Sequence, residues 1–220
     1  MRHFLDSYHD AREKAAWQPQ QHELTELGQA VLPPGLRTGL ADASRYAAVV
    51  ISAHGTPPGT SDMPGGGPAG HAGLAQALAL TGGERLTAAE LLTCRLPDAL
   101  ITPSCWSARL TVRAAVEPLG LPTAALAAGA RWVLAGTVDI GDTTTASLMS
   151  AFYQRLHAGS TPAAALQHAQ VNFLRPRPRT PPGTWAGLTI VGDGFTPLGA
   201  SRPASAPAGS AGHGRAAREG

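Results

Sequence analysis

The sequence predicts an α/β fold with a mostly parallel sheet and helices on both of its faces. Short apolar runs, bounded by Gly, Pro or polar residues, alternate along the chain with segments of helical pattern. This alternation is typical of parallel sheets, in which right-handed crossovers place helices on both faces. Apolar residues make up 43% of the 220 residues and charged residues 15%, a balance that suits a folded domain with a buried core.

Four apolar runs are predicted to be strands. The first (AAVVISA) is rich in β-branched side chains and ends at His54-Gly55, as expected of a buried strand. The second (ALIT) ends at Pro103-Ser104-Cys105, and the third reads WVLAGTV. The four runs are residues 47–53, 99–102, 132–138 and 185–191.

Helices are predicted between these runs. Thr87 and Glu90 form a capping-box pattern that opens a short helix through Leu92. Pro at a first-turn position starts two further helices, one at Pro122 and one from Thr161-Pro162 to about Phe173. An amphipathic pattern predicts a helix over residues 143–157, with Asp142 before it. The Gly/Pro-rich residues 56–83 are expected to form a long loop with a short helix near 74–80.

The predicted core, residues 46–195, lies between two less ordered flanks. Residues 1–45 are polar and weakly helical or irregular, and residues 196–220 end in a low-complexity tail that we expect to be disordered. The net charge of +2 predicts neither nucleic-acid nor membrane-surface binding. We expect a cytoplasmic protein, because no apolar run reaches 18 residues and the N-terminus lacks the apolar stretch of a signal peptide.

The two cysteines exclude a disulfide framework and a four-cysteine zinc site. His71 and His54 could form half of a metal site, but no carboxylate or cysteine pattern supports one, so we expect no metal and no cofactor. Cys94 is expected to be a packed structural thiol. The arginines of the segment RPRPRTPPG (175–183) are expected in an exposed loop, either as a solvated connector or as a contact for an acidic partner.

His54 and Cys105 are the candidate catalytic residues. Each follows a predicted strand, and the carboxyl ends of parallel strands meet at one edge of a sheet. If the two strands are neighbours, the thiol can act as nucleophile while the imidazole accepts and returns its proton. The N–H groups of Gly55 and Cys105 could bind the oxyanion. The alternative is a loop histidine beside a small buried thiol.

Six segments follow one another in the order found in one family. They resemble the CHAT family, caspase-like cysteine peptidases of bacteria in the caspase–separase clan. The resemblance implies a caspase-like sheet, a His54/Cys105 dyad and cleavage of peptide bonds through a thioester. The segments are AHG (53–55), LTAAELL (86–92), ALITPSC (99–105), PLGLPTAALAAGARWVLAG (118–136), DIGDTTTASLMSAFYQRLHAGSTPAAALQHAQ (139–170) and WAGLTIVGDG (185–194).

The sequence departs from this family at two places. Relatives often show a Glu-Thr-Gly-like sequence after the cysteine, where this chain has Trp106-Ser107-Ala108. Trp106 could form one wall of a substrate pocket, or it could pack in the core. Relatives also usually carry an N-terminal half-sheet and often a TPR-like sensor. The short N-terminal segment therefore predicts an incomplete N-terminal half, or a sensor on a separate partner chain.

Asp142 matches an acidic position that the family often places after its third core strand. It could cap the helix over residues 143–157, or it could bind a basic side chain of the substrate, with Asp139 as the alternative. Two functions remain open at this point. One is a cysteine endopeptidase acting on a protein in bacterial regulation, defence or programmed cell death, and the other is a catalytically silent domain that serves as a protein-interaction module.

Overall fold

The computed structural model describes residues 3–7, 39–40, 43, 46–55, 73–80, 85–113 and 116–200. The tail from Ser201, most of residues 1–45, and His71 in the Gly/Pro-rich loop lie outside these described residues. The expectations stated for them stay predictions.

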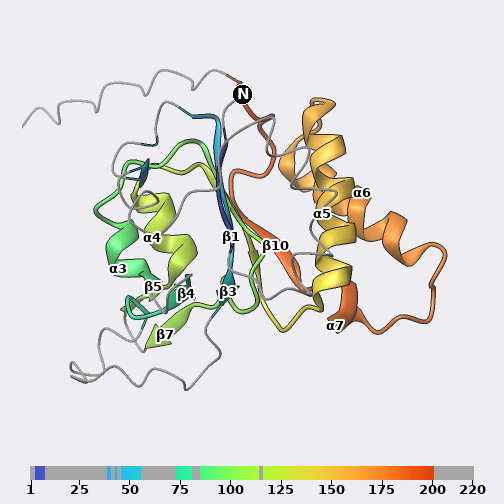
Figure 1. Ribbon diagram of the computed structural model, residues 1–220, viewed down its shortest axis with the longest axis horizontal. Coiled ribbons are helices and arrows are strands. Elements are labelled where there is room, and N and C mark those ends of the chain that lie inside the picture. Colours follow the sequence, from blue (N-terminus) through green and yellow to red (C-terminus); the bar gives the residue numbers. More distant parts are fainter. Residues whose placement is uncertain are drawn as a thin grey trace, which may run out of the picture.

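A five-stranded sheet forms the centre of the fold (Figure 1). Its strands follow one another in the order β1-β2-β6-β9-β10. The first four are mutually parallel, and β10 runs antiparallel to β9. This confirms the predicted α/β fold with a mostly parallel sheet. The strands are β1 (His3–Ser7), β2 (Ala48–Ser52), β6 (Ala99–Thr102), β9 (Trp132–Gly136) and β10 (Leu188–Gly192).

Helices cover both faces of the sheet, as predicted (Figure 1). Because successive strand residues point to opposite faces, β2, β6 and β9 contribute to two separate cores. Val50, Ile101 and Leu134 pack with residues of one helical layer, and their chain neighbours Val49, Leu100 and Val133 pack with the other. The first layer is α5 (Asp142–His157), α6 (Pro162–Leu174) and α7 (Pro182–Trp185), and the second is α3 (Ala88–Leu91) and α4 (Leu121–Ala127).

Side-chain caps start two of the helices where the sequence predicts them. At α3, Thr87 Oγ1 accepts the N–H of Glu90 at 3.2 Å, and the Thr87 N–H donates to Glu90 Oε2 at 2.7 Å, so the capping box is complete. At α6, Thr161 Oγ1 accepts the N–H of Ala164 at 3.3 Å. Asp142 differs from the expectation. It is already the first residue of α5, and Gly141 holds the cap position with no side-chain hydrogen bond. The capping role proposed for Asp142 is therefore wrong.

Several elements differ from the sequence-based prediction. The short helix expected near residues 74–80 is wrong, because β4 (Ala77–Ala79) lies there between β3 (His54–Gly55) and β5 (Arg85–Thr87) in a small antiparallel sheet. β1 is a strand that the sequence analysis did not predict, and it adds to the sheet beside β2. In both places, pairing with strands distant in sequence sets the structure, and local patterns do not report such pairing. The unpredicted hairpin is β7 (Thr111–Arg113) and β8 (Val116–Leu119).

Candidate active site

His54 and Cys105 are brought to one edge of the sheet by the pairing of β2 with β6. The two strands are parallel neighbours, with Ala48 opposite Ala99 and Val50 opposite Ile101. Their carboxyl ends therefore emerge side by side, as the sequence analysis expects. Both residues line one cavity of about 20 Å³, a volume close to that of a single water molecule. Its lining is Ser52, Ala53, His54, Pro103, Ser104, Cys105, Ile140, Asp142 and Thr145.

Gly55 allows β3 to lie directly against the loop that carries Cys105, residues 103–110 between β6 and β7, which we call the cysteine loop. A Cβ atom placed on Gly55 would lie 1.6 Å from the carbonyl oxygen of Cys105, which is far inside van der Waals contact. On the other side, a Cβ atom on Gly136 would lie 2.3 Å from the carbonyl oxygen of Ser104. The backbone of the cysteine loop is thus clamped between two glycines, one after β2 and one at the end of β9.

Two buried polar side chains shape the cysteine loop from inside. The Ser107 hydroxyl, 1% exposed, lies 2.9 Å from the carbonyl oxygen of Thr102 and 2.7 Å from that of Ser104. It also accepts the N–H of Gly136 at 2.9 Å, which ties the loop to β9. Gln76 donates from Nε2 to the carbonyl oxygen of Trp106 at 2.7 Å and accepts the N–H of Leu121 at 2.8 Å.

The sequence analysis missed Gln76 and gave Ser107 no role. Gln76 stands alone among apolar residues in LAQALAL, and a lone polar residue in such a run signals a buried hydrogen-bonding group. For Ser107 the sequence holds no comparable signal, because a serine in a loop is most often solvated.

The Cys105 thiol is half-buried and forms hydrogen bonds with the backbone of Ile140. Its sulfur accepts the N–H of Ile140 at 3.4 Å and donates to the carbonyl oxygen of Ile140 at 3.6 Å. Burial raises the pKa of this thiol, the Ile140 hydrogen bond opposes the shift, and the carboxylates of Asp139 and Asp142 raise the pKa further. The thiol is therefore protonated at neutral pH in this conformation, and it needs a base to become a nucleophile.

The pH dependence of alkylation follows from this raised pKa. Because only the thiolate reacts, the iodoacetamide rate at Cys105 should keep rising with pH beyond the ordinary thiol range. Asp139→Asn removes one of the charges that raise the pKa, so this variant should react faster at pH 7. Mass spectrometry of the peptide that contains Cys105 measures both rates. A rate that already levels off below pH 7 would show a lowered pKa and contradict this description.

Trp106 links the cysteine loop to the loop between β9 and α5. Its backbone has φ 58°, a left-handed conformation that is strained for an aromatic residue. Its indole N–H donates to Asp139 Oδ1 at 2.6 Å. The structure therefore brings Asp139 to Trp106, and places Asp142 in the lining of the cavity beside Cys105. Neither Asp139 nor Trp106 lines the cavity.

The remaining candidates lie away from this cavity or form no site. Cys94 is half-buried in the turn that follows α3 and donates to the carbonyl oxygen of Glu90 at 3.4 Å. Within the described residues, no group of three or more His, Cys, Asp or Glu side chains could hold a metal ion. No helix among the described residues is long and apolar enough to span a membrane.

A comparison with protein families decides the identity of the domain. The CHAT domain matches residues 6–193, which is most of the chain. The chain belongs to the CHAT domain family. The match begins well before residue 46, where the sequence analysis placed the start of the core, and so includes part of β1. Among curated proteins, none is significantly similar in sequence.

Two solved structures with a similar fold are a separase and an Arg-specific cysteine proteinase. Separase from the Saccharomyces cerevisiae separase–securin complex superposes with a TM-score of 0.58 at 16% identity, covering 87% of this CHAT domain chain and 11% of the separase chain. The Arg-specific cysteine proteinase gingipain R superposes with a TM-score of 0.56 at 9% identity, covering 90% of this chain and 47% of that one. The caspase-like fold implied by the sequence resemblance is thereby confirmed.

Proposed function

We propose that this CHAT domain is a cysteine endopeptidase that cleaves a protein partner, with Cys105 as nucleophile and His54 as general acid and base. The observation that carries the proposal is the single cavity lined by His54 and Cys105 at the carboxyl edge of the sheet. The fold of the two peptidases and the clamped cysteine loop support it. We further propose a bacterial, cytoplasmic role in regulation, defence or programmed cell death, with any sensor on a separate chain.

The proposed reaction proceeds through two acyl-transfer steps. His54 accepts the thiol proton as Cys105 Sγ attacks the carbonyl carbon of the substrate, and the N–H groups of Gly55 and Cys105 bind the resulting oxyanion. The C–N bond breaks as the imidazolium protonates the leaving amine, which leaves a thioester on Cys105. His54 then deprotonates a water molecule that attacks the thioester, releasing the carboxylic acid and restoring the thiol.

Asp142 is the proposed contact for a basic side chain of the substrate. It is exposed to solvent, lines the cavity beside Cys105 and is not the helix cap. Asp139 is the weaker candidate, because it does not line the cavity. The gingipain of similar fold is described as Arg-specific, and we propose the same kind of preference for this chain.

A peptide library tests the function and the Asp142 assignment together. Wild-type protein should cut after Arg or Lys, and Asp142→Asn should lose about 10-fold or more on those peptides while its melting temperature stays unchanged. Mass spectrometry of the cut sites measures this preference, and Asp139→Asn is the matched control. Equal cleavage of every peptide by wild type and Asp142→Asn would overturn the pocket role. A library left uncut even with a co-expressed partner protein would overturn the peptidase function.

A silent interaction module is the second candidate function. The observation that favours it is the small volume of the cavity, about 20 Å³, which is too narrow for a substrate side chain without movement of the β9–α5 loop. A module of this kind would bind its partner protein without cutting it. Binding that is retained in the Cys105→Ala variant, together with no cleavage by wild type, would favour this candidate.

A further inference from the structure

The segment between α6 and α7 is the most concentrated positive charge in the described chain. Arg175, Arg177 and Arg179 lie within five residues of one another, and all three are exposed. We call residues 175–181 (RPRPRTP) the basic arm. The whole chain has a net charge of only +2, so the arm is a local feature and not part of a generally basic surface.

Proline and hydrogen bonds restrict the conformation of the basic arm. Pro176, Pro178 and Pro181 each fix one backbone dihedral angle. The Arg177 N–H donates to the carbonyl oxygen of Leu174 at 2.7 Å, and the Thr180 N–H donates to that of Arg177 at 3.0 Å. The Trp185 indole N–H also donates to the Thr180 carbonyl oxygen at 3.3 Å. A restrained segment loses less conformational entropy when it binds a partner.

The guanidinium groups of the arm are not neutralised by the described part of the chain. There, no carboxylate lies within 4.0 Å of any of the three, whereas Arg131 pairs with Asp98 at 3.6 Å and Asp193 at 2.8 Å. Arg177 instead lies 4.8 Å from the centre of the Phe173 ring and donates to the Phe173 carbonyl oxygen at 3.3 Å. Arg131 thus holds the fold together, while Arg175 and Arg179 are available to an external anion.

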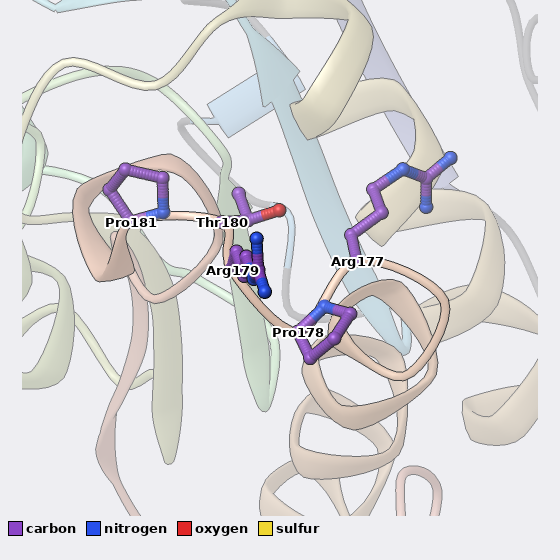
Figure 2. A pocket seen from close by; sticks show the side chains of 5 residues that line it. All are labelled: Arg177, Pro178, Arg179, Thr180 and Pro181. Atoms are coloured by element: carbon purple, nitrogen blue, oxygen red, sulfur yellow. The ribbon is translucent and has the colours of Figure 1, made fainter.

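A shallow hollow of about 410 Å³ lies on the basic arm. Figure 2 shows the side chains of Arg179 and Thr180 between those of Pro181 and Arg177 in the lining of this hollow. Arg179 contributes a guanidinium group to its lining, beside one hydroxyl and two proline rings, and this combination suits a carboxylate on a short apolar stem.

The chain that follows the basic arm runs to the same end of the sheet as the Cys105 cavity. The segment that follows it packs on the β9–α5 loop, since the Thr137 N–H donates to the Gly187 carbonyl oxygen at 2.8 Å and a Cβ atom on Gly187 would lie 2.7 Å from the Ile140 side chain. Ile140 is the residue bonded to Cys105 Sγ. Figure 1 shows α7 and β3 toward the same end of the molecule.

We propose that the basic arm binds an acidic segment of the protein substrate that is cut at Cys105, a proposal that rests on the proposed peptidase function. Arginine pairs with planar carboxylates through two parallel hydrogen bonds, which makes aspartate and glutamate side chains the matching ligands. A nucleic acid fits less well, because a polyanion needs an extended basic surface and the arm offers only three arginines within five residues.

Fluorescence anisotropy of a labelled hexaglutamate peptide tests the proposal on the full chain. Every protein in this assay carries the Cys105→Ala substitution, so that cleavage does not interfere with the binding measurement. Arg175→Ala/Arg179→Ala should weaken binding by about 10-fold or more, and Arg177 is left in place because it packs on Phe173. Arg95→Ala/Arg155→Ala, which removes two exposed arginines outside the arm, should change affinity by less than about 2-fold. Thermal melting verifies that each variant is folded.

Three outcomes would overturn the proposal. One is an unchanged affinity in the arm variant, and another is an equal loss in the control variant. The third is binding of labelled dodecathymidylate as tight as that of hexaglutamate with the same loss in the arm variant, which would make the arm a nucleic-acid contact. Failure of the peptidase function is seen separately. If the chain binds hexaglutamate through the arm but cuts no library peptide, the peptidase function is overturned and the binding of an acidic ligand by the arm is still supported.

Discussion

Cys105→Ala should abolish peptide hydrolysis, by roughly 10³-fold or more, while Cys94→Ala keeps most of the activity. The two thiols are alike in exposure and in the direction of their pKa shift, since burial raises both. They differ in position, because Cys105 lines the cavity with His54 and Cys94 donates to Glu90 within α3. Cleavage of the best library peptide, measured for both variants, separates the two.

The pair of variants is informative only when both proteins are folded. Far-UV circular dichroism and the melting temperature establish this for each. Neither thiol is fully buried, so a large loss of stability is not expected from either change. Equal loss of activity in two folded variants would contradict the assignment of Cys105 as the nucleophile.

Gly55→Ala should disable the site even though it adds a single methyl group. The new Cβ atom would lie 1.6 Å from the carbonyl oxygen of Cys105, so either β3 or the cysteine loop must move. Overpacking of this kind costs about 1–3 kcal/mol of stability, and more where the contact is backbone. Movement of the Cys105 backbone also misplaces its N–H group and its thiol relative to His54. We expect a loss of activity of about 10²-fold or more.

Gly141→Ala is the matched control for this change. Gly141 lies in the neighbouring β9–α5 loop with φ −64°, a conformation open to any residue, and a Cβ atom there would have no neighbour within 4 Å. Its activity and melting temperature should stay near those of wild type. A Gly55→Ala variant as active as Gly141→Ala would mean that the close approach of β3 to Cys105 is absent in solution.

The sequence predicts those parts of the fold in which local signals and tertiary contacts agree. Both faces are buried in β2 (AVVIS) and β6 (ALIT). Strands of this kind appear in the sequence as continuous apolar runs, whichever neighbours they pair with. The Thr87–Glu90 capping box and the Thr161-Pro162 start are also local signals, because the bonds that begin each helix lie within its first turn.

Other parts depend on contacts between distant segments, which the sequence pattern does not contain. β1 pairs with β2 across more than 40 residues, and its own segment HFLDS carries no strand boundary signal. Residues 77–79 have good helix formers, yet pairing with both β3 and β5 makes them a strand.

The same distinction holds for the candidate site. His54 and Cys105 are found from sequence because both follow strands, and strand ends gather at one edge. The contacts that hold the cysteine loop in place are not found from sequence, because Gln76, for example, reaches the Trp106 carbonyl oxygen from 30 residues away. The bond between Trp106 and Asp139 is likewise long-range. Asp142 is the better candidate for substrate contact because it lines the cavity and Asp139 does not.

Labelling with a thiol-reactive peptide probe is the most direct test of the His54–Cys105 pair. A peptide acyloxymethyl ketone ending in arginine should modify wild-type protein at Cys105 alone, as located by mass spectrometry, and should react about 10²-fold more slowly with His54→Ala. Iodoacetamide, added to separate aliquots of the two proteins, should alkylate Cys94 at equal rates, which shows that both proteins are folded alike. Equal probe rates at Cys105 in wild type and in His54→Ala would contradict a catalytic pair at this edge of the sheet.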